Sequence, residues 1–379
     1  MRIAGIIAEY NPFHLGHRYH IEKTREAGAT HVAVVMSGSV VQRGDIACMD
    51  AHERAKAAIN GGADLVLELP PQYALSAARD FARAGTEIFR QLGQVKLLSF
   101  GAETVDVSKL GAALTAIENS ELKIKAYMSA GRTYPQAAAE VCGGEVAKVI
   151  SEPNNTLALE YLRALRGSGI EPFAVARTVP HDSETTSGCY ASASQIRKIL
   201  RDGDSAEEFL GYVPDAQGLS FIANGEKAIL YRLAMMDKAD FERVPYCDEL
   251  AGRLYQATRR ADSLAEVFDA VKSRNFTHAR VRRAAMLAAL GITKEDMDIM
   301  PFVRVLALNQ RGMEILRAAR ETSQIALGDS LKELSEVSPE AKRQAEIIET
   351  ASRLRCLCQS DGGAGVSEYQ RRAVVVKGE

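Results

Sequence analysis

Short apolar runs alternate with longer amphipathic segments over the first 200 residues of the chain. Residues 72–92 place one apolar stripe at helical spacing, and Gly85 lies inside it, where it would let the helix approach a sheet closely. Four shorter runs rich in Val, Ile and Leu are apolar on both faces, as strands of a buried parallel sheet are, and cover residues 3–8, 31–36, 64–69 and 95–100. This alternation predicts an α/β fold with a Rossmann-like, doubly wound parallel sheet.

The pattern changes towards the C-terminus. Residues 105–168 are predicted to be mostly helical, with a strand at 172–177 and a polar loop at 181–189 after them. Later still, strand-like runs nearly vanish and helical periodicity dominates. We therefore expect an α/β domain over residues 1–214 and a mainly α-helical domain over residues 215–379.

Composition is typical of a globular protein in water: 46% of residues are hydrophobic, 25% are charged and the mean hydropathy is -0.13. The net charge of -2 excludes a basic coat over the whole surface but allows a local basic face. No apolar run approaches the ~20 residues of a membrane span. Glu9, Asn11 and Pro12 interrupt the first apolar run too early for a secretory signal. We expect a cytoplasmic protein with no membrane partner.

Cysteine spacing gives no sign of a metal centre. The chain has six cysteines, and only Cys356 and Cys358 lie close together. A single C-x-C lacks the second ligand pair that zinc sites show. We expect reduced thiols and no protein-bound metal.

The segment after the first predicted strand carries the candidate chemistry. It reads Glu-Tyr-Asn-Pro-Phe-His-Leu-Gly-His over residues 9–17, with His14 and His17 three positions apart at a predicted helix start. Two imidazoles beside helix N-terminal amides bring hydrogen-bond donors and a favourable dipole together, as a polyphosphate site requires. Two alternatives stay open, a zinc site and histidines that only cap a surface helix.

This segment resembles a known superfamily. The H-x-G-H pattern at residues 14–17, placed after a first strand, is similar to the signature of nucleotidylyltransferases, which are relatives of class I aminoacyl-tRNA synthetases. Their second signature is a phosphate-binding helix start, and residues 192–198 resemble it. Ser192 and Gln195 also have the spacing of a capping box, which predicts a helix start on its own.

A narrower resemblance covers nearly the whole chain. The sequence looks like the tRNA(Met) cytidine acetate ligase family at residues 9–14, 36–38, 41–45, 63–70, 99–101, 152–155, 302–306 and 309–312, the last two in its helical C-terminal part. The resemblance implies an enzyme that uses ATP to activate acetate as acetyl-adenylate. It then acetylates the wobble cytidine of elongator tRNA(Met), which gives N4-acetylcytidine.

The resemblance also implies roles for individual residues. His14 and His17 are the expected catalytic residues, which stabilise charge on the phosphates, and Mg²⁺ is expected to be carried on those phosphates. One of Asn154 and Asn155 is expected to contact the nucleotide and one to cap the following helix. The expected ATP-binding residues are Ile7, Ala8, Glu9, Tyr10, Asn11, Pro12, Phe13, His14, Gly16, His17, His20, Gly101, Asn154, Asn155, Arg177, Ser192, Ser194 and Arg197.

Two departures from the family pattern lie near this predicted site. Leu15 stands where the family commonly has Asn, and Ser39-Val40 stands where it has Asn-Phe. We expect the loop with Ser39-Val40 to border the site, and both departures to bear on fine positioning and on the identity of the acyl substrate.

A basic stretch at residues 251–285 is the candidate RNA surface. It holds eight basic and three acidic residues, and Tyr255 and Phe276 lie among them as candidates for stacking on bases. The alternative is a solvated helix face. With the resemblance, tRNA-binding residues are expected at Arg259, Arg260, Lys272, Arg274, Arg280, Arg282 and Arg283, with tRNA and acetate as partners and no DNA.

Two other classes of protein remain open. One is an adenylyltransferase that joins AMP to a small phosphorylated metabolite, but it would not need a long helical extension. The other is a nucleotide-sensing RNA-binding protein without catalysis, which has less reason to keep both phosphate motifs.

Overall fold

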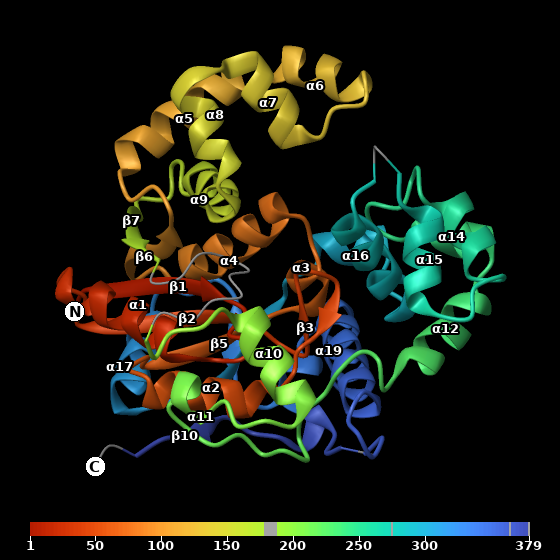
Figure 1. The fold of residues 1–379 in the computed structure, drawn as a ribbon. Coiled ribbons are helices and arrows are strands. Elements are labelled where there is room, and N and C mark those ends of the chain that lie inside the picture. The colour runs from red at the N-terminus through yellow and green to blue at the C-terminus, as the bar shows by residue number, and fades with distance from the viewer. Residues whose placement is uncertain (178–187, 274–275, 364, 378–379) are drawn as a thin grey trace.

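The computed structural model describes residues 1–177, 188–273, 276–363 and 365–377 (Figure 1). An eight-stranded sheet lies at its centre, in the order β10-β8-β5-β2-β1-β6-β7, with β9 paired to β8. The strands are β1 (Ile3–Ala8), β2 (His31–Ser37), β5 (Leu65–Leu69), β6 (Val95–Ala102), β7 (Glu171–Ala176), β8 (Phe302–Leu308), β9 (Ala326–Gly328) and β10 (Val374–Val375).

Five neighbouring strands, β5, β2, β1, β6 and β7, are parallel and form the predicted doubly wound sheet. β2 and β5 are buried along their whole length, which is why they are apolar at every position. Alternate residues of β1 enter different cores, Ile3 and Ile7 on one face and Ala4 and Ile6 on the other. Helices α1 (Leu15–Glu26) and α2 (Ala51–Asn60) cover one face, and α4 (Ala78–Leu92) and α17 (Gln310–Ala319) cover the other.

The helix predicted over residues 72–92 is in fact two helices, α3 (Pro71–Ala74) and α4. The chain is not helical at Leu75–Ala77, where the Ser76 hydroxyl donates to the Tyr73 carbonyl at 2.7 Å. Such a local bond offers the backbone an alternative to the helix. The predicted role of Gly85 is confirmed, because a Cβ there would lie 2.6 Å from Ile7 Cδ1 of β1.

A helical insert stands between β6 and β7, at the top of Figure 1. Its five helices, which lie between residues 107 and 164, confirm that residues 105–168 are mostly helical. It consists of α5 (Val107–Asn119), α6 (Glu121–Ser129), α7 (Tyr134–Cys142), α8 (Gly144–Ser151) and α9 (Pro153–Ala164), of which α9 packs on α4 and β6.

After β7 the chain forms α10 (Ala193–Asp202) and α11 (Glu207–Leu210), and then a helical lobe at the right of Figure 1. We call α12 to α16 the lobe: α12 (Glu226–Ala234), α13 (Lys238–Arg243), α14 (Ala251–Ala257), α15 (Leu264–Val271) and α16 (His278–Ala289). The short helix η1 (Lys294–Asp298) then leads back to the sheet.

Residues 215–379, which we expected to be mainly α-helical, also contribute the strands β8, β9 and β10. β8 pairs antiparallel with β5, so the sheet crosses the expected boundary at 214/215. Residues 302–306, which we assigned to a helical part, are thus a strand. Arg304 lies inside it with 1% exposure, paired with Glu368 at 2.7 Å. The remaining elements are α18 (Leu331–Ser335), α19 (Pro339–Leu357) and η2 (Glu368–Gln370).

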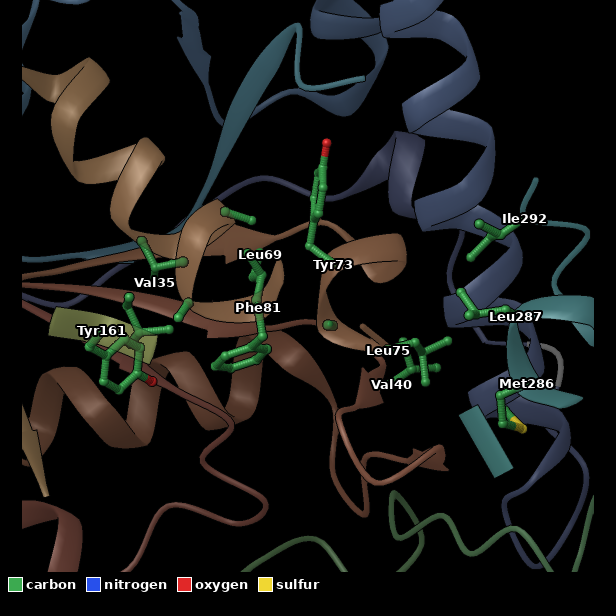
Figure 2. Close-up of a cluster of buried hydrophobic side chains, with 14 of the residues drawn as sticks. Val35, Val40, Leu69, Tyr73, Leu75, Phe81, Tyr161, Met286, Leu287 and Ile292 are labelled. Carbon is green, nitrogen blue, oxygen red and sulfur yellow. The ribbon is translucent and has the colours of Figure 1, made fainter. Parts of the chain in front are cut away.

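A short hairpin, β3 (Val40–Val41) and β4 (Asp45–Ile46), connects the sheet to the lobe. Its turn residue Gly44 has φ +71° and packs on the backbone of Arg282 and Arg283 in α16. One apolar core runs from sheet to lobe, and Figure 2 shows its members Val40 and Leu75 with Met286 of α16. Among the described residues, no helix combines the length and apolarity that crossing a membrane requires.

Close packing of α4 on β1 gives a prediction for stability. Replacing Gly85 by Ala should lower the free energy of unfolding by roughly 1–3 kcal/mol, because the added methyl overlaps Ile7. Gly111→Ala in α5 is the matched control, since nothing lies within 4 Å of its Cβ, and it should stabilise by about 0.5–1 kcal/mol. Denaturant unfolding of both variants measures the difference. Equal effects would show that α4 does not press on β1.

Candidate active site

A cavity of about 320 Å³ opens at the carboxyl edge of the sheet. Ile7, Ala8 and Glu9 at the end of β1, Gly101 in β6 and Arg177 after β7 line it. The starts of α1 and α10 and the β3–β4 hairpin close it from other sides. Ligands bind at this edge in open α/β sheets.

The two signature histidines occupy the first turn of α1. His14 is the N-cap and its Nδ1 accepts the Gly16 N–H at 3.0 Å, while His17 Nδ1 accepts the His14 N–H at 3.3 Å. Their ring centroids are 3.8 Å apart. Because both Nδ1 atoms accept hydrogen bonds, the network assigns the proton of each neutral imidazole to Nε2. Both residues line the cavity, so the site has two Nε2–H donors.

Both imidazoles are neutral at physiological pH. Burial, with the charges of Arg177 and Arg197, lowers the pKa of His14 to about 3. Burial and the neighbouring His14 hold the pKa of His17 well below its ordinary value. The histidines therefore offer hydrogen bonds without positive charge, and cations at this site come from the arginines.

His20 belongs to a chain of hydrogen bonds under the cavity. The Thr24 hydroxyl donates to the His20 carbonyl at 2.8 Å, and Ser99 Oγ lies 2.7 Å from Thr24 Oγ1 and 2.8 Å from His20 Nε2. Since the Thr24 proton is used, Ser99 donates to Thr24 and His20 donates to Ser99. Burial, then the charge of Arg177, lowers the pKa of His20 to about 4.

The loop from β1 to α1 is held by its neighbours. Asn11 Oδ1 accepts the Cys48 N–H at 2.8 Å, and the Asn11 carbonyl accepts Arg197 Nη1 at 2.7 Å. Tyr10 and Asn11 line the cavity, whereas Pro12 and Phe13 do not and instead lie buried behind it. Pro12 and Phe13 thus shape the loop, although we had expected them among the nucleotide contacts.

The second predicted motif faces the first across the cavity. Ser192 is the N-cap of α10 and accepts the Gln195 N–H at 3.2 Å, and Gly203 ends the helix at φ +85°. Ser192, Ser194 and Arg197 line the cavity, and Arg197 Nη2 lies 3.3 Å from Ser194 Oγ. Through its bond to Asn11, Arg197 joins the starts of α1 and α10.

The two asparagines of α9 have different positions. Asn154 lines the cavity and donates to Glu103 at 2.5 Å. Asn155 is fully buried, and its Oδ1 accepts the N–H groups of Glu103 and Thr104. Neither is the helix cap, which is Glu152. Both lie in the first turn, and only Asn154 is placed to meet a ligand.

The hairpin supplies a cavity wall that we did not assign from the sequence. Val41, Gln42, Arg43 and Asp45 line the cavity, and the Gln42 N–H donates to Glu9 Oε1 at 2.7 Å. The family pattern at residues 41–45 was the available signal. It gave no indication of which side chains point inward.

The two departures from the family pattern lie outside this cavity. Leu15 lines a separate cavity of about 410 Å³, together with Phe13 and Tyr212. Ser39 and Val40 are buried and do not line the site. The loop that follows them does border the cavity, as we expected, through Val41, Gln42 and Arg43.

The basic stretch at 251–285 does not form one continuous surface. Arg282 pairs with Asp45 of the hairpin at 3.0 Å. Phe276 is buried and Arg259 covers the ring of Tyr255 at 3.7 Å, which corrects the expectation that these aromatics are available to bases. Of the predicted tRNA-binding residues, three are half-buried, namely Arg280, Arg282 and Arg283. Three others are exposed, namely Arg259, Arg260 and Lys272, and Arg274 lies outside the described residues.

The sequence and the fold both match known proteins over most of the chain. Residues 1–362 match the HIGH nucleotidyl transferase family. The chain is 30% identical to the tRNA(Met) cytidine acetate ligase of Acetivibrio thermocellus, over 94% of this chain and 95% of the relative. It is 33% identical to that of Syntrophotalea carbinolica, over 88% and 86%. A crystal structure of Thermotoga maritima TmcAL bound with alpha-thio ATP shares the fold, at 23% identity, a TM-score of 0.87 and full coverage of both chains.

The tautomers of the two histidines give a spectroscopic prediction. In ¹⁵N NMR spectra, His14 and His17 should both show a protonated Nε2 and a bare Nδ1, and should stay neutral from pH 8 to pH 5. Spectra of His14→Ala and His17→Ala assign the signals. An imidazolium signal from either residue above pH 6 would contradict the assignment.

Proposed function

Because the chain belongs to the HIGH nucleotidyl transferase family and to the tRNA(Met) cytidine acetate ligase family, we propose that it is an ATP-dependent ligase that acetylates a cytidine of tRNA(Met). The proposed product is N4-acetylcytidine at the wobble position of elongator tRNA(Met). One observation carries the proposal: the two Nε2–H donors of α1 and the serine and arginine motif of α10 line the same cavity.

The proposed first step is attack of an acetate oxygen on the α-phosphorus of ATP, with pyrophosphate as the leaving group. Acetate is already ionised at neutral pH, so the protein needs no nucleophile of its own. Its task is to hold the reactants in line and to stabilise charge that develops on the phosphates.

The protonation states determine which groups would donate hydrogen bonds to the phosphates and which would supply positive charge. His14 and His17, the proposed catalytic residues, donate through Nε2 as neutral groups. Positive charge comes from Arg177 and Arg197, and the amino ends of α1 and α10 add the favourable end of their dipoles. We propose ATP contacts from Asn154 and Ser194 as well, since both line the cavity.

The cavity lining fits Mg²⁺ held on the nucleotide. Among the described residues, two carboxylates line it, Glu9 and Asp45, and both already accept hydrogen bonds, from Gln42 N–H, Ile46 N–H and Arg282. The described residues therefore offer the ion few oxygen ligands, as expected when it is bound chiefly by phosphates and water. Bound there, Mg²⁺ would neutralise part of the phosphate charge.

We propose that the α/β part activates acetate and that the lobe, within residues 215–379, docks tRNA. Arg260 and Lys272 are exposed on the lobe and are the proposed phosphate contacts, together with Arg259. The two rival classes are not favoured, because the relatives that match most of the chain are tRNA-modifying ligases by name.

Removal of either histidine donor tests the proposed chemistry. His14→Ala and His17→Ala should each slow acetate-dependent ATP–pyrophosphate exchange by roughly 10²–10³-fold, while ATP binding weakens much less, because the donors act on charge that develops in the transition state. His278→Ala, an exposed histidine of the lobe, is the control and should exchange at the wild-type rate. Equal losses in ATP affinity and rate would show plain ground-state binding.

The salt dependence of tRNA binding tests the lobe. Arg260→Ala with Lys272→Ala should flatten the slope of log affinity against log salt by about 0.7–0.9 per lost phosphate contact. Arg282→Ala is the contrasting variant. It should leave that slope unchanged and lower exchange activity, because Arg282 holds the hairpin wall through Asp45. An unchanged slope in the double variant would show that tRNA docks elsewhere.

A further inference from the structure

We propose that Glu9 is the catalytic base of the second step, the group that takes the proton from the cytidine amine as it is acetylated. This inference rests on the proposed function and adds a residue to it.

The second step requires a proton acceptor. The N4 nitrogen of cytidine attacks the carbonyl carbon of acetyl-adenylate, a C–N bond forms, and the C–O bond to the phosphate breaks, so that AMP leaves with the electron pair. The attacking amine starts with two protons and the amide product keeps one. One proton must therefore leave the nitrogen. The phosphate of AMP becomes a proton acceptor only once the C–O bond has broken, whereas a side chain held beside N4 can take the proton during the attack.

His14 and His17 cannot serve in this way. Each has its Nδ1 lone pair engaged by a backbone amide of the α1 cap, and each already carries a proton on Nε2. Accepting another proton would break the cap that orients the pair. Burial and nearby positive charge oppose the cationic form of both as well.

Among the described residues that line the cavity, Asp45, His20 and the buried tyrosines Tyr10 and Tyr161 are also unsuited. Both carboxylate oxygens of Asp45 have donors, Ile46 N–H at 2.8 Å and Arg282 at 3.0 Å. His20 is held by its bond to Ser99 at 2.8 Å, and burial disfavours the cation that it would become on taking a proton. Burial raises the pKa values of the Tyr10 and Tyr161 hydroxyls, so both stay protonated.

Glu9 has the properties that a base needs. Only its Oε1 is engaged by a described residue, through the Gln42 N–H at 2.7 Å, so Oε2 can accept a proton. Its main chain is held too, because its carbonyl accepts Arg54 Nη1 at 2.7 Å. Arg54 is fully buried and also donates to the carbonyls of Ser37 and Gly38, so Glu9 stands on a rigid support.

Charge explains why a carboxylate is suitable in a cavity for anions. An ionised carboxylate only accepts hydrogen bonds, so it gives nothing to acetate or to phosphate oxygens. It matches the cytosine amine, which is a donor that carboxylates recognise in nucleic acids. Glu9 would thus orient N4 before the attack and take the proton during it.

The test separates the two half-reactions. Glu9→Gln keeps an oxygen for the Gln42 N–H but removes the proton acceptor. Single-turnover acetyl transfer from preformed acetyl-adenylate to tRNA should fall by about 10²–10⁴-fold, while acetate-dependent pyrophosphate exchange should change by less than about tenfold. Glu9→Asp, which keeps a carboxylate, should restore part of the transfer rate. Glu22→Gln, an exposed carboxylate of α1, is the matched control and should behave as wild type in both assays.

Each outcome decides the question. Wild-type transfer by Glu9→Gln would overturn the proposal. So would equal loss of exchange and transfer, which would place Glu9 on ATP or its metal in the first step. If the wild-type protein shows no acetate-dependent exchange at all, the proposed function fails, and that result does not depend on Glu9.

Discussion

The capping of α1 by its own two histidines is the constraint on which the site depends. A helix start leaves amides without partners, and here imidazole nitrogens accept two hydrogen bonds in that first turn. The same bonds fix both tautomers and direct the remaining protons outward. At His14 and His17 the same ring therefore does both jobs: Nδ1 caps the helix and Nε2–H is the donor that faces the cavity.

Because the two histidines are neutral, the positive charge at the cavity comes from arginines elsewhere in the chain. Arg197 contributes charge and also joins the two phosphate motifs through the Asn11 carbonyl. The hairpin wall depends in turn on the lobe, because Asp45 is held by Arg282 and Gly44 rests on the α16 backbone. The proposed adenylation cavity and the proposed tRNA-docking lobe share this contact, so a change in the lobe can affect the cavity wall.

Much of the fold was predictable because its central strands are apolar on both faces and its motifs are local. The His14–His17 turn and the Ser192 cap each lie within four residues of sequence. The features that the sequence did not predict depend on residues far away along the chain. β8 has a charged Arg304 at its centre, which is neutralised by Glu368. The direction of Arg282 is set by a hairpin more than 200 residues earlier, and Asn154 and Asn155 differ only in the side of α9 that they face.

A structure with a non-hydrolysable ATP analogue and acetate tests the central claim most directly. The account predicts phosphate oxygens at about 2.7–3.2 Å from the Nε2 atoms of His14 and His17, with Ser194 and Arg197 on the opposite side. Phosphates bound in the cavity beside Leu15 and Tyr212, or out of reach of both imidazoles, would contradict it.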